Sequence, residues 1–466
     1  MLRRDASRLT RHLGRGIGRG VGSSLGRGDG GGGLGRRLGL GLGLAAALTG
    51  VAIVAGGDDP AADVGARAWA VTSAAPRSLV VPDPVIAPAP PIPARPSAAV
   101  AAAPHLDADQ LDLSRLELRG DRYVAPLGDG RLAVLTLDPT LQAAAERALD
   151  RAMAPRGAIV VTAPDGRVLA LAGRRTESPE GGKDGVADPS LALTSWAPAA
   201  SVFKVVTAAA LLEGGVTPAT KVCYHGGLRS VTESNLEDDR HDRACQDLAY
   251  GLAHSQNAII AKLAHQHVAP EALASVAHRL GFDRAIAFPA PASFGQVDVP
   301  TERGLELART AAGFRGVELS TLGGAMLAST VASGGLAVQP RLIAALIGPD
   351  GSEQPALAPR SSARVLDAGV AADLAAMMTK TCAEGSAAAA FGGRKGLQVP
   401  VAGKTGTLSR DESPYMQYSW FVGFAPADKP TLTVSVLLGN AELWHLKAHT
   451  AARMVLAEGL RTRAGS

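Results

Sequence analysis

Regular spacing of hydrophobic residues begins only after about residue 105, where it first predicts strands and a helix. The segment LAVLTL (132–137) is expected to be a strand, because apolar residues with a preference for extended structure dominate it. Asp138 then caps a helix with a proline in its first turn, which continues through LQAAAERALDRAM. The segments 158–163 and 167–173 flank a Pro-Asp-Gly turn and predict a β-hairpin.

The rest of the chain combines long helical patterns with three late strands. Helical spacing recurs in the ranges 201–213, 247–266, 270–280, 301–313, 319–333, 366–383 and 447–462. Strands are expected at 400–408, 417–425 and 431–439. Strands that are followed by helical insertions, then by antiparallel strands and a closing helix, predict an α+β fold.

The first 104 residues show a different organisation. Residues 1–37 carry nine Arg against two Asp among many Gly, and they are expected to form a disordered cytoplasmic arm. The uncharged run 38–55 would span about 27 Å as a helix, which favours a membrane anchor with its basic side in the cytoplasm. A cleaved signal peptide or a plain linker stays an alternative. Residues 56–104 are a Pro/Ala-rich linker, and 105–466 are the expected globular domain.

Composition and charge exclude several classes of protein. Hydrophobic residues make up 46% of the 466 residues, which is enough to bury a core. A net charge of +4 is too small to indicate nucleic-acid binding by itself. Three Cys are too few for a disulfide-rich scaffold. No sequence window is long enough for several membrane spans, so the chain is not a polytopic transporter.

A first chemical motif is Ser201-Val202-Phe203-Lys204, at the start of a predicted helix. Residues three apart lie on one face of a helix, so the hydroxyl and the amine can meet. A lysine amine can serve as the base that activates a serine when burial or a neighbouring cation lowers its pKa. The motif is weak alone, because a capping serine beside a solvated lysine would look the same.

Two further motifs follow in the chain. Ser255-Gln256-Asn257 lies at a helix entrance, where a hydroxyl and an amide can point into one cleft, although an ordinary N-cap is the simpler interpretation. Lys404-Thr405-Gly406-Thr407 lies on a predicted strand, with Lys404 and Gly406 on one side and the threonines on the other. A lysine near hydroxyls suits a carboxylate, but lysine is also common on exposed edge strands.

The three motifs together carry a resemblance to a known family. S-x-x-K, S-D-N and K-T-G in this order are typical of penicillin-binding proteins and class A β-lactamases, and here the three motifs are 54 and 149 residues apart. The second motif departs from this pattern in having Gln256 at its centre, but the flanking serine and asparagine carry the polar groups. The chain resembles the transpeptidase domain of the monofunctional penicillin-binding proteins, which are serine D,D-transpeptidases, over roughly residues 130–460. The segments that carry the likeness are LTLDPTLQAAAERAL, GAIVVTAPDGRVLALAG, PAASVFKVVTAAALLEGG, LSTLGGAMLASTVASGG, AGKTGT, SWFVGFAP and TLTVSVLLG. A further departure is Ala199-Ala200, where the family usually has Pro-Gly before the serine.

The resemblance implies a fold and a role for each motif residue. The fold would be β-lactamase/transpeptidase-like, with an antiparallel sheet flanked by helices and an all-helical subdomain. Ser201 would be the nucleophile and Lys204 its base. Ser255 would relay the proton to the leaving amine, and the amide of Asn257 would hold the substrate peptide. The substrate's carboxylate would be bound by Lys404, Thr405, Gly406 and Thr407. The backbone N–H groups of Ser201 and Thr407 would form the oxyanion hole.

The resemblance also implies a reaction and partners. A peptidoglycan stem peptide that ends in D-Ala-D-Ala would acylate Ser201, and an amine from a second strand would form the cross-link, without metal or cofactor. β-Lactams would bind the same site, the cytoplasmic membrane would hold the anchor, and a separate glycan polymerase is a candidate partner; no nucleic acid is expected. Attack by water would make the enzyme a D,D-carboxypeptidase. A catalytically inactive cell-wall scaffold is a further alternative.

Two related classes fit less well. A class A β-lactamase needs a deacylating glutamate in an E-x-x-L-N pattern, and neither Glu302, Glu306 nor Glu318 provides it. A membrane-bound β-lactam sensor has several spans, whereas this chain has at most one expected anchor.

The cysteines leave three interpretations open. Cys223 and Cys245 would form a disulfide in an oxidising compartment outside the membrane. They could instead stay reduced and buried, or bind zinc together with the nearby His225 and His241. The third cysteine, Cys382, is expected to be a small buried hydrophobic residue.

Overall fold

The structure is a computed structural model. It describes residues 111–176, 185–356, 362–393, 396–410, 415–442 and 444–464. The predicted cytoplasmic arm, membrane anchor and linker (1–37, 38–55 and 56–104) lie outside these residues. Within the described ranges, no helix has both the length and the apolar character that a bilayer crossing requires.

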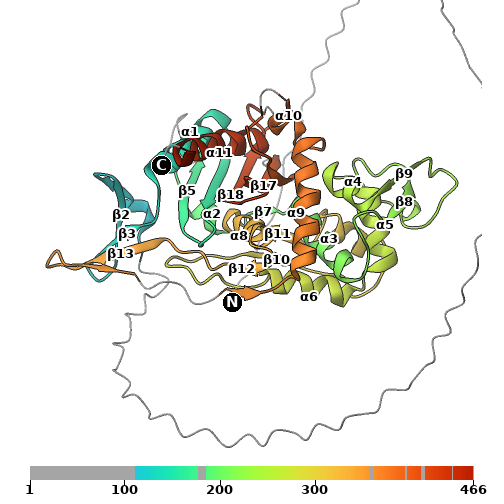
Figure 1. Ribbon diagram of the computed structural model, residues 1–466, viewed down its shortest axis with the longest axis horizontal. Coiled ribbons are helices and arrows are strands. Elements are labelled where there is room, and N and C mark those ends of the chain that lie inside the picture. Colours follow the sequence, from blue (N-terminus) through green and yellow to red (C-terminus); the bar gives the residue numbers. More distant parts are fainter. Residues whose placement is uncertain are drawn as a thin grey trace, which may run out of the picture. The chain divides into compact units, whose positions relative to one another are not determined.

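A six-stranded antiparallel sheet is the centre of the fold, with the strand order β16-β17-β18-β4-β5-β6. Its strands are β4 (Arg156–Thr162), β5 (Val168–Arg175), β6 (Val186–Ala187), β16 (Ala402–Arg410), β17 (Met416–Ala425) and β18 (Leu432–Asn440). Helices α1 (Pro139–Ala152) and α11 (Ala448–Ala464) cover one face, and α8 (Thr321–Ala332) covers the other (Figure 1). The expected α+β fold is confirmed.

Side chains of the sheet alternate between two hydrophobic cores. On β4, Ile159 and Val161 pack in the core under α1 and α11, whereas Ala158 and Val160 belong to the core on the other face. Every residue of β18 is buried. Because both faces are covered, the strands are almost continuously apolar, which is why the sequence reveals them so clearly.

The predicted strands and helices around this sheet agree with the structure within a few residues. The helix after Asp138 begins at Pro139, and the Asp138 side chain accepts hydrogen bonds from the backbone N–H groups of Thr140 and Leu141. The predicted hairpin is β4 and β5, and the three late strands are β16 to β18. The predicted strand at 132–137 is shorter and spans Leu132–Leu135 as β3.

The second region is mainly helical and packs beside the open end of the sheet (Figure 1). Its helices are α3 (Lys204–Glu213), α4 (Leu248–Ala253), α5 (Asn257–His267), α6 (Pro270–Leu280), α7 (Leu305–Ala311), α9 (Ala368–Ala383) and α10 (Ala388–Phe391). The single helix expected at 247–266 is wrong. It is broken into α4 and α5 because Ser255 has a left-handed backbone with φ of 58°.

Short strands that the sequence pattern did not predict complete the fold. One sheet joins β1 (Glu117–Arg119), β2 (Arg122–Pro126), β3, β13 (Ile343–Ile347) and β14 (Glu353–Pro355). A second sheet joins β10 (Gly295–Val297), β11 (Val317–Leu319) and β7 (Ala197–Pro198). Two-stranded pairs are β8 (Lys221–Tyr224) with β9 (Ala244–Asp247), and β12 (Leu336–Ala337) with β15 (Ala363–Arg364). Short helical elements are η1 (Leu113–Arg115), α2 (Ser190–Leu193), η2 (Ala200–Phe203) and η3 (Glu233–Asn235). Strands of two to five residues are too short for a periodic signal.

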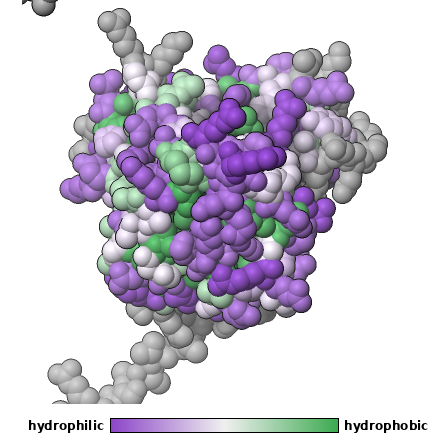
Figure 2. Space-filling view, turned by 90° about the vertical axis from the view of Figure 1, so that its right-hand side faces the viewer, coloured by the Kyte–Doolittle hydropathy of each residue, from purple (hydrophilic) through white to green (hydrophobic). Residues whose placement is uncertain are grey.

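The outer face of the helical region is largely polar. Figure 2 views the molecule from that side and shows hydrophilic residues over most of the coloured surface, with hydrophobic residues in small, separate areas. Leu228 is the most exposed large hydrophobic residue among those described, at 84%. It lies on the loop that joins β8 to β9, next to the candidate site described below.

Candidate active site

The three sequence motifs, which are far apart in the chain, meet in one cleft of about 850 Å³. The lining includes Ser201 from η2, Ser255 and Asn257 from the junction of α4 and α5, and Thr405 to Thr407 from β16. The sheet therefore provides one wall of the cleft and the helical region provides the others.

Ser201 and Lys204 are in direct contact. Lys204 is completely buried, and its Nζ lies 2.6 Å from Ser201 Oγ and 2.5 Å from Asn257 Oδ1. Burial, and next the positive charge of Lys404, hold the pKa of Lys204 well below its usual value. The helix expected to begin near Ser201 starts as a 3₁₀ turn, and α-helical geometry begins only at Lys204. A neutral amine at this distance can take the proton of the serine hydroxyl.

Ser255 links the two buried lysines. Its Oγ accepts a hydrogen bond from Lys404 Nζ at 2.9 Å and lies 3.4 Å from Lys204 Nζ. The left-handed backbone of Ser255 costs about 1 kcal/mol or more in a non-glycine residue. Such strain persists only where surrounding contacts fix it, and here it turns the serine side chain toward both amines.

Asn257 connects Lys204 to the loop after β8. Its Oδ1 accepts from Lys204, and its Nδ2 donates to the carbonyl oxygen of Gly227 at 2.7 Å. The N-cap of α5 is Gln256, whose side chain accepts from the backbone N–H of Ala258. The capping interpretation of Ser255 or Asn257 is therefore wrong, and both side chains face the cleft instead.

Lys404 is the second fully buried lysine of the site. Its Nζ donates to Ser255 Oγ and, at 3.0 Å, to the carbonyl oxygen of Thr405. Burial lowers the pKa of Lys404 to about 7. The hydrogen-bonded series Ser201, Lys204, Ser255 and Lys404 can pass a proton from the serine toward a group bound in the cleft.

The remaining residues of the third motif follow the alternation of a strand. Lys404 and Gly406 are buried, Thr405 is half-buried and Thr407 is exposed to the cleft. The Thr405 hydroxyl lies 2.6 Å from Ser386 Oγ. Ser386, which follows α9, was not predicted, because one serine between a helix and a Gly/Ala-rich segment carries no pattern.

Two glycines let backbone segments approach the serine closely. A Cβ on Gly406 would lie 3.3 Å from the Cβ of Ala200, so glycine allows β16 to pack against η2. Gly313 has φ of 84°, and a Cβ there would lie 2.0 Å from the carbonyl oxygen of Ala200. Ala200 itself has φ of 49°, where glycine would be unstrained, so the Ala199-Ala200 sequence places a strained residue directly before Ser201.

The loop between β8 and β9 is held by a disulfide and by a buried ion pair. Cys223 and Cys245 are joined across the two strands. Lys262 of α5 is 1% exposed, and its Nζ lies 2.7 Å from Asp242 Oδ2 and 2.9 Å from the Cys223 carbonyl oxygen. Although burial raises the pKa of Asp242, hydrogen bonds from Lys262 and His225 lower it to about 2. One helix therefore holds this loop at both Asn257 and Lys262.

The zinc interpretation finds no support in this geometry. His225 Nδ1 lies 2.6 Å from Asp242, and His241 Nδ1 lies 2.5 Å from Asp239. The described residues contain no group of three or more His, Cys, Asp or Glu side chains placed to bind a metal ion. Cys382 is buried and unpaired, and burial raises the pKa of its thiol.

The fold and the site together define a class. An antiparallel sheet flanked by helices, with a serine beside a buried lysine at the start of a helix, is the arrangement of the serine acyltransferases with a β-lactamase/transpeptidase-like fold. The family model of the penicillin binding protein transpeptidase domain matches residues 157–457. The chain belongs to this family.

Relatives and solved structures agree with this assignment. Peptidoglycan D,D-transpeptidase PbpA of Mycobacterium tuberculosis (strain ATCC 25618 / H37Rv) is 28% identical over 257 residues, which cover 53% of this chain and 51% of that protein. PbpA of Mycolicibacterium smegmatis is 28% identical over 334 residues, which cover 65% of this chain and 66% of that protein. The chain thus spans about half to two thirds of the length of these relatives.

Two solved structures illustrate the likeness in three dimensions. The structure of PBPA from M. tuberculosis has a TM-score of 0.58 and 26% identity, covering 71% of this chain and 83% of that one. An imipenem acyl-enzyme complex of the same M. tuberculosis protein has a TM-score of 0.56 and 26% identity, and the match covers 72% of this chain and 80% of that one.

Replacing Gly313 by alanine should disturb the serine through the Ala200 carbonyl. Gly313→Ala adds backbone strain of about 1 kcal/mol and a clash worth about 1–3 kcal/mol. Gly215→Ala is a matched control, since Gly215 has a similar φ of 88° but no atom near its missing Cβ. Urea unfolding should show a larger loss in the free energy of unfolding for Gly313→Ala than for Gly215→Ala. Only Gly313→Ala should react with benzylpenicillin at least about tenfold more slowly than wild type. Equal effects of both variants would contradict this role.

The low pKa of Lys404 predicts that stability rises with pH. An unfolded lysine has a pKa of about 10.4 and keeps its proton between pH 7 and 10, whereas folded Lys404 gives it up near pH 7. The unfolded state then binds more protons, so the free energy of unfolding should increase by up to about 1.4 kcal/mol per pH unit in this window.

Lys404→Met should reduce that slope, and replacing the exposed Lys429 by Met should leave it unchanged. Urea unfolding at pH 7, 8 and 9 measures all three slopes. If wild type and Lys404→Met have the same slope, Lys404 is protonated in the folded protein throughout.

Removing the buried partner of Asp242 should loosen the loop. Lys262→Met leaves a carboxylate that is nearly inaccessible to water without its cation, a change that typically costs about 3–5 kcal/mol. Lys221→Met, on the exposed end of β8, should cost less than about 0.5 kcal/mol. Thermal unfolding measures both, and a small effect of Lys262→Met would show that Asp242 gains water when the pair is lost.

Proposed function

We propose that the chain is a peptidoglycan D,D-transpeptidase, in which Ser201 is acylated by a stem peptide that ends in D-Ala-D-Ala. The observation that carries the proposal is the fully buried Lys204, with Nζ 2.6 Å from Ser201 Oγ and its pKa held low. Two relatives that bear the name peptidoglycan D,D-transpeptidase support it.

In the first step, neutral Lys204 takes the proton of Ser201, and Oγ attacks the carbonyl carbon between the two D-alanines. The backbone N–H groups of Ser201 and Thr407 stabilise the oxyanion that forms. The proton then moves from Lys204 through Ser255 to the leaving amine. The bond to the terminal D-alanine breaks, and an ester between Ser201 and the peptide remains.

In the second step, the amine of an acceptor strand attacks this ester. Lys204 takes the proton of that amine and returns it to Ser201 Oγ as the ester bond breaks. The product is an amide cross-link between two strands. If water took the place of the amine, the product would be a shortened peptide, and the enzyme would act as a D,D-carboxypeptidase.

The terminal carboxylate of the donor peptide is bound, in this proposal, at the Lys404 end of the cleft. The Thr405 and Thr407 hydroxyls donate to it, and Lys404 adds positive potential from behind the strand. Ser386 joins this group through its contact with the Thr405 hydroxyl. A bound carboxylate favours the protonated form of Lys404 and so raises its pKa above the free-enzyme value of about 7.

The same serine should react with β-lactams, in agreement with the acyl-enzyme complexes of the solved relatives. We further propose that residues 38–55 anchor the chain in the cytoplasmic membrane, with the domain from about residue 105 on the outer side. The disulfide between Cys223 and Cys245 supports an oxidising compartment.

The decisive experiment is intact-mass analysis of the protein after reaction with benzylpenicillin, followed by peptide mapping. Wild type should gain one penicilloyl group on Ser201, and Ser201→Ala should gain none. Lys204→Arg should acylate at least about a hundredfold more slowly, because a guanidinium does not accept a proton at any working pH. Ser352→Ala, at an exposed turn, is the matched control and should react like wild type.

An adduct on Ser201→Ala would refute the nucleophile, and no adduct on wild type would favour an inactive scaffold. Transpeptidation is separated from hydrolysis with a D-Ala-D-Ala donor and an excess of an amine acceptor. A new amide product supports the proposal, whereas release of D-alanine with only the shortened peptide supports a carboxypeptidase.

A further inference from the structure

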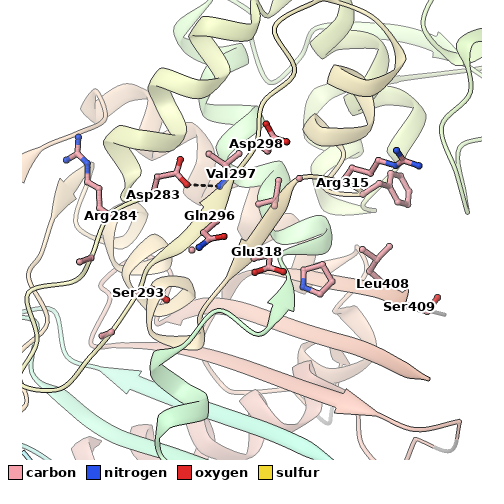
Figure 3. A pocket seen from close by; sticks show the side chains of 17 residues that line it. Asp283, Arg284, Ser293, Gln296, Val297, Asp298, Arg315, Glu318, Leu408 and Ser409 are labelled. Atoms are coloured by element: carbon pink, nitrogen blue, oxygen red, sulfur yellow. Dashed lines mark hydrogen bonds between the residues drawn. The ribbon is translucent and has the colours of Figure 1, made fainter. Parts of the chain in front are cut away.

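The cleft that contains Ser201 extends around both faces of β16. Gly406 and Leu408 lie on the face toward η2, where Leu408 also borders a second cavity of about 770 Å³ beside β7, β10 and β11 (Figure 3). Thr405 and Thr407 lie on the opposite face, which α11 covers further into the sheet. The residues that line the cleft on this α11 side have no role in the steps described above.

Three residues at or just before the start of α11 line this side of the cleft: Trp444, Lys447 and His449. We call them the α11 group. Their place is fixed by the backbone N–H of Ala448, which donates to Ser419 Oγ at 3.1 Å. Ser419 is paired with Thr407 across β16 and β17, so the two side chains lie on the same face about 5 Å apart. The α11 group therefore lies about one strand spacing beyond Thr407.

The α11 group offers a positive charge and an uncharged hydrogen-bond donor. Lys447 is exposed, and among the described residues it has no ion-pair partner. Burial, and next the charge of Lys447, lower the pKa of His449 to about 4, so its ring is neutral at pH 7 and keeps one N–H. The described lining of the cleft includes Arg229 and Lys447 but no Asp or Glu. These groups suit a carboxylate.

The donor peptide has no group left for this position. In the proposed reaction its terminal carboxylate lies at the hydroxyls of Thr405 and Thr407, and the donor chain ends there. The rest of the donor lies on the other side of the scissile carbonyl and stays attached to Ser201 in the ester. A carboxylate that contacts Lys447, beyond Thr407, therefore belongs to a second molecule.

The acceptor strand is the second molecule of the reaction, and it enters on this side. Its amine attacks the ester along the path by which the D-alanine amine left, because forming and breaking this bond follow the same route. The rest of the acceptor then extends over the vacated D-alanine site toward the α11 group. A carboxylate six bonds from the amine lies about 7 Å from it in an extended chain, which is close to one strand spacing plus one hydrogen bond.

We propose that Lys447 and His449 bind a carboxylate of the acceptor strand and so select acceptors whose amine lies about six bonds from a carboxylate. This rests on the proposed function, because it requires an acyl-enzyme on Ser201. The Lys447 ammonium donates a charge-assisted hydrogen bond to the carboxylate, and the His449 ring adds a neutral one. Both residues act on specificity and take no part in proton transfer.

The test compares two acceptors that differ only in this charge. Nα-acetyl-L-lysine has a carboxylate six bonds from its side-chain amine, and Nα-acetyl-L-lysine amide has a neutral group there. An equimolar mixture is added to the full chain with the donor Nα,Nε-diacetyl-L-Lys-D-Ala-D-Ala, which has no free amine, and chromatography separates the two amide products. Wild type should favour the acceptor with the carboxylate about fivefold at low salt. Added salt should reduce this ratio, because Lys447 is exposed.

Variants locate the contact. Lys447→Met should bring the product ratio close to one, and Lys447→Glu should invert it by repelling the carboxylate. His449→Phe should lower the ratio, whereas His449→Gln keeps an N–H donor and should retain most of it. Arg229→Met is the matched control, because it removes the same charge from the opposite wall of the cleft, and it should keep the ratio within about twofold of wild type. Both acceptors compete for one acyl-enzyme, so an effect on the donor cancels in the ratio.

Three results would overturn the assignment. The first is a wild-type ratio near one, and the second is a ratio that Lys447→Glu leaves unchanged. The third is an equal effect of Arg229→Met and Lys447→Met, which would assign the preference to the general potential of the cleft. If Lys447→Glu slows release of D-alanine from the donor alone as much as it slows formation of the amide, Lys447 serves the donor and the proposal fails.

Labelling of the same wild-type sample with benzylpenicillin separates the two levels of the proposal. Labelling together with equal amounts of both amide products refutes the acceptor site and leaves the transpeptidase proposal in place. Labelling with release of D-alanine but no amide from either acceptor indicates a carboxypeptidase and refutes both. No labelling and no release of D-alanine refutes the acyl-enzyme itself.

Discussion

Two fully buried lysines in one cleft are the constraint on which the rest of the site depends. Each ammonium is costly to remove from water, and the two repel one another, so the site favours loss of a proton. Burial, and next the positive charge of Lys404, hold the pKa of Lys204 well below its usual value. The amide of Asn257 and the hydroxyls of Ser201 and Ser255 keep the amine hydrogen-bonded in either state. A base of this kind requires the surrounding backbone to be fixed.

That fixation comes from backbone packing and from one buried ion pair. Gly313 and Gly406 bring neighbouring segments against Ala200, so the turn before Ser201 has no room to relax. On the opposite wall, Asn257 is held by the loop carbonyl of Gly227, and the loop itself is held by Lys262 and the disulfide. The strained backbone of Ser255 lies between these two supports. The sheet and the helical region are thus each rigid near the position where their residues meet.

The reactive residues of the site can be predicted from the sequence, whereas most of the residues that position them cannot. Ser201, Lys204, Ser255, Asn257 and Lys404 belong to short motifs, and long apolar strands such as β18 have a strong periodic signal. The break at Ser255 was missed because no glycine or proline marks it. Ser386, Asp242 and Gly313 were missed because their importance comes from contacts with residues far away in the chain. The small sheet of β7, β10 and β11 was missed because its strands have only two or three residues.

The position of that small sheet relates the fold to the nucleophile. β7 ends at Pro198, three residues before Ser201, and both of its residues are paired with β11. This pairing therefore fixes the strand that leads directly into the nucleophile turn. Gly313 confines the same turn, because a Cβ there would lie 2.0 Å from the carbonyl oxygen of Ala200. With the nucleophile held in this way, binding energy from the substrate can align the scissile carbonyl in the proposed reaction rather than reorganise the enzyme.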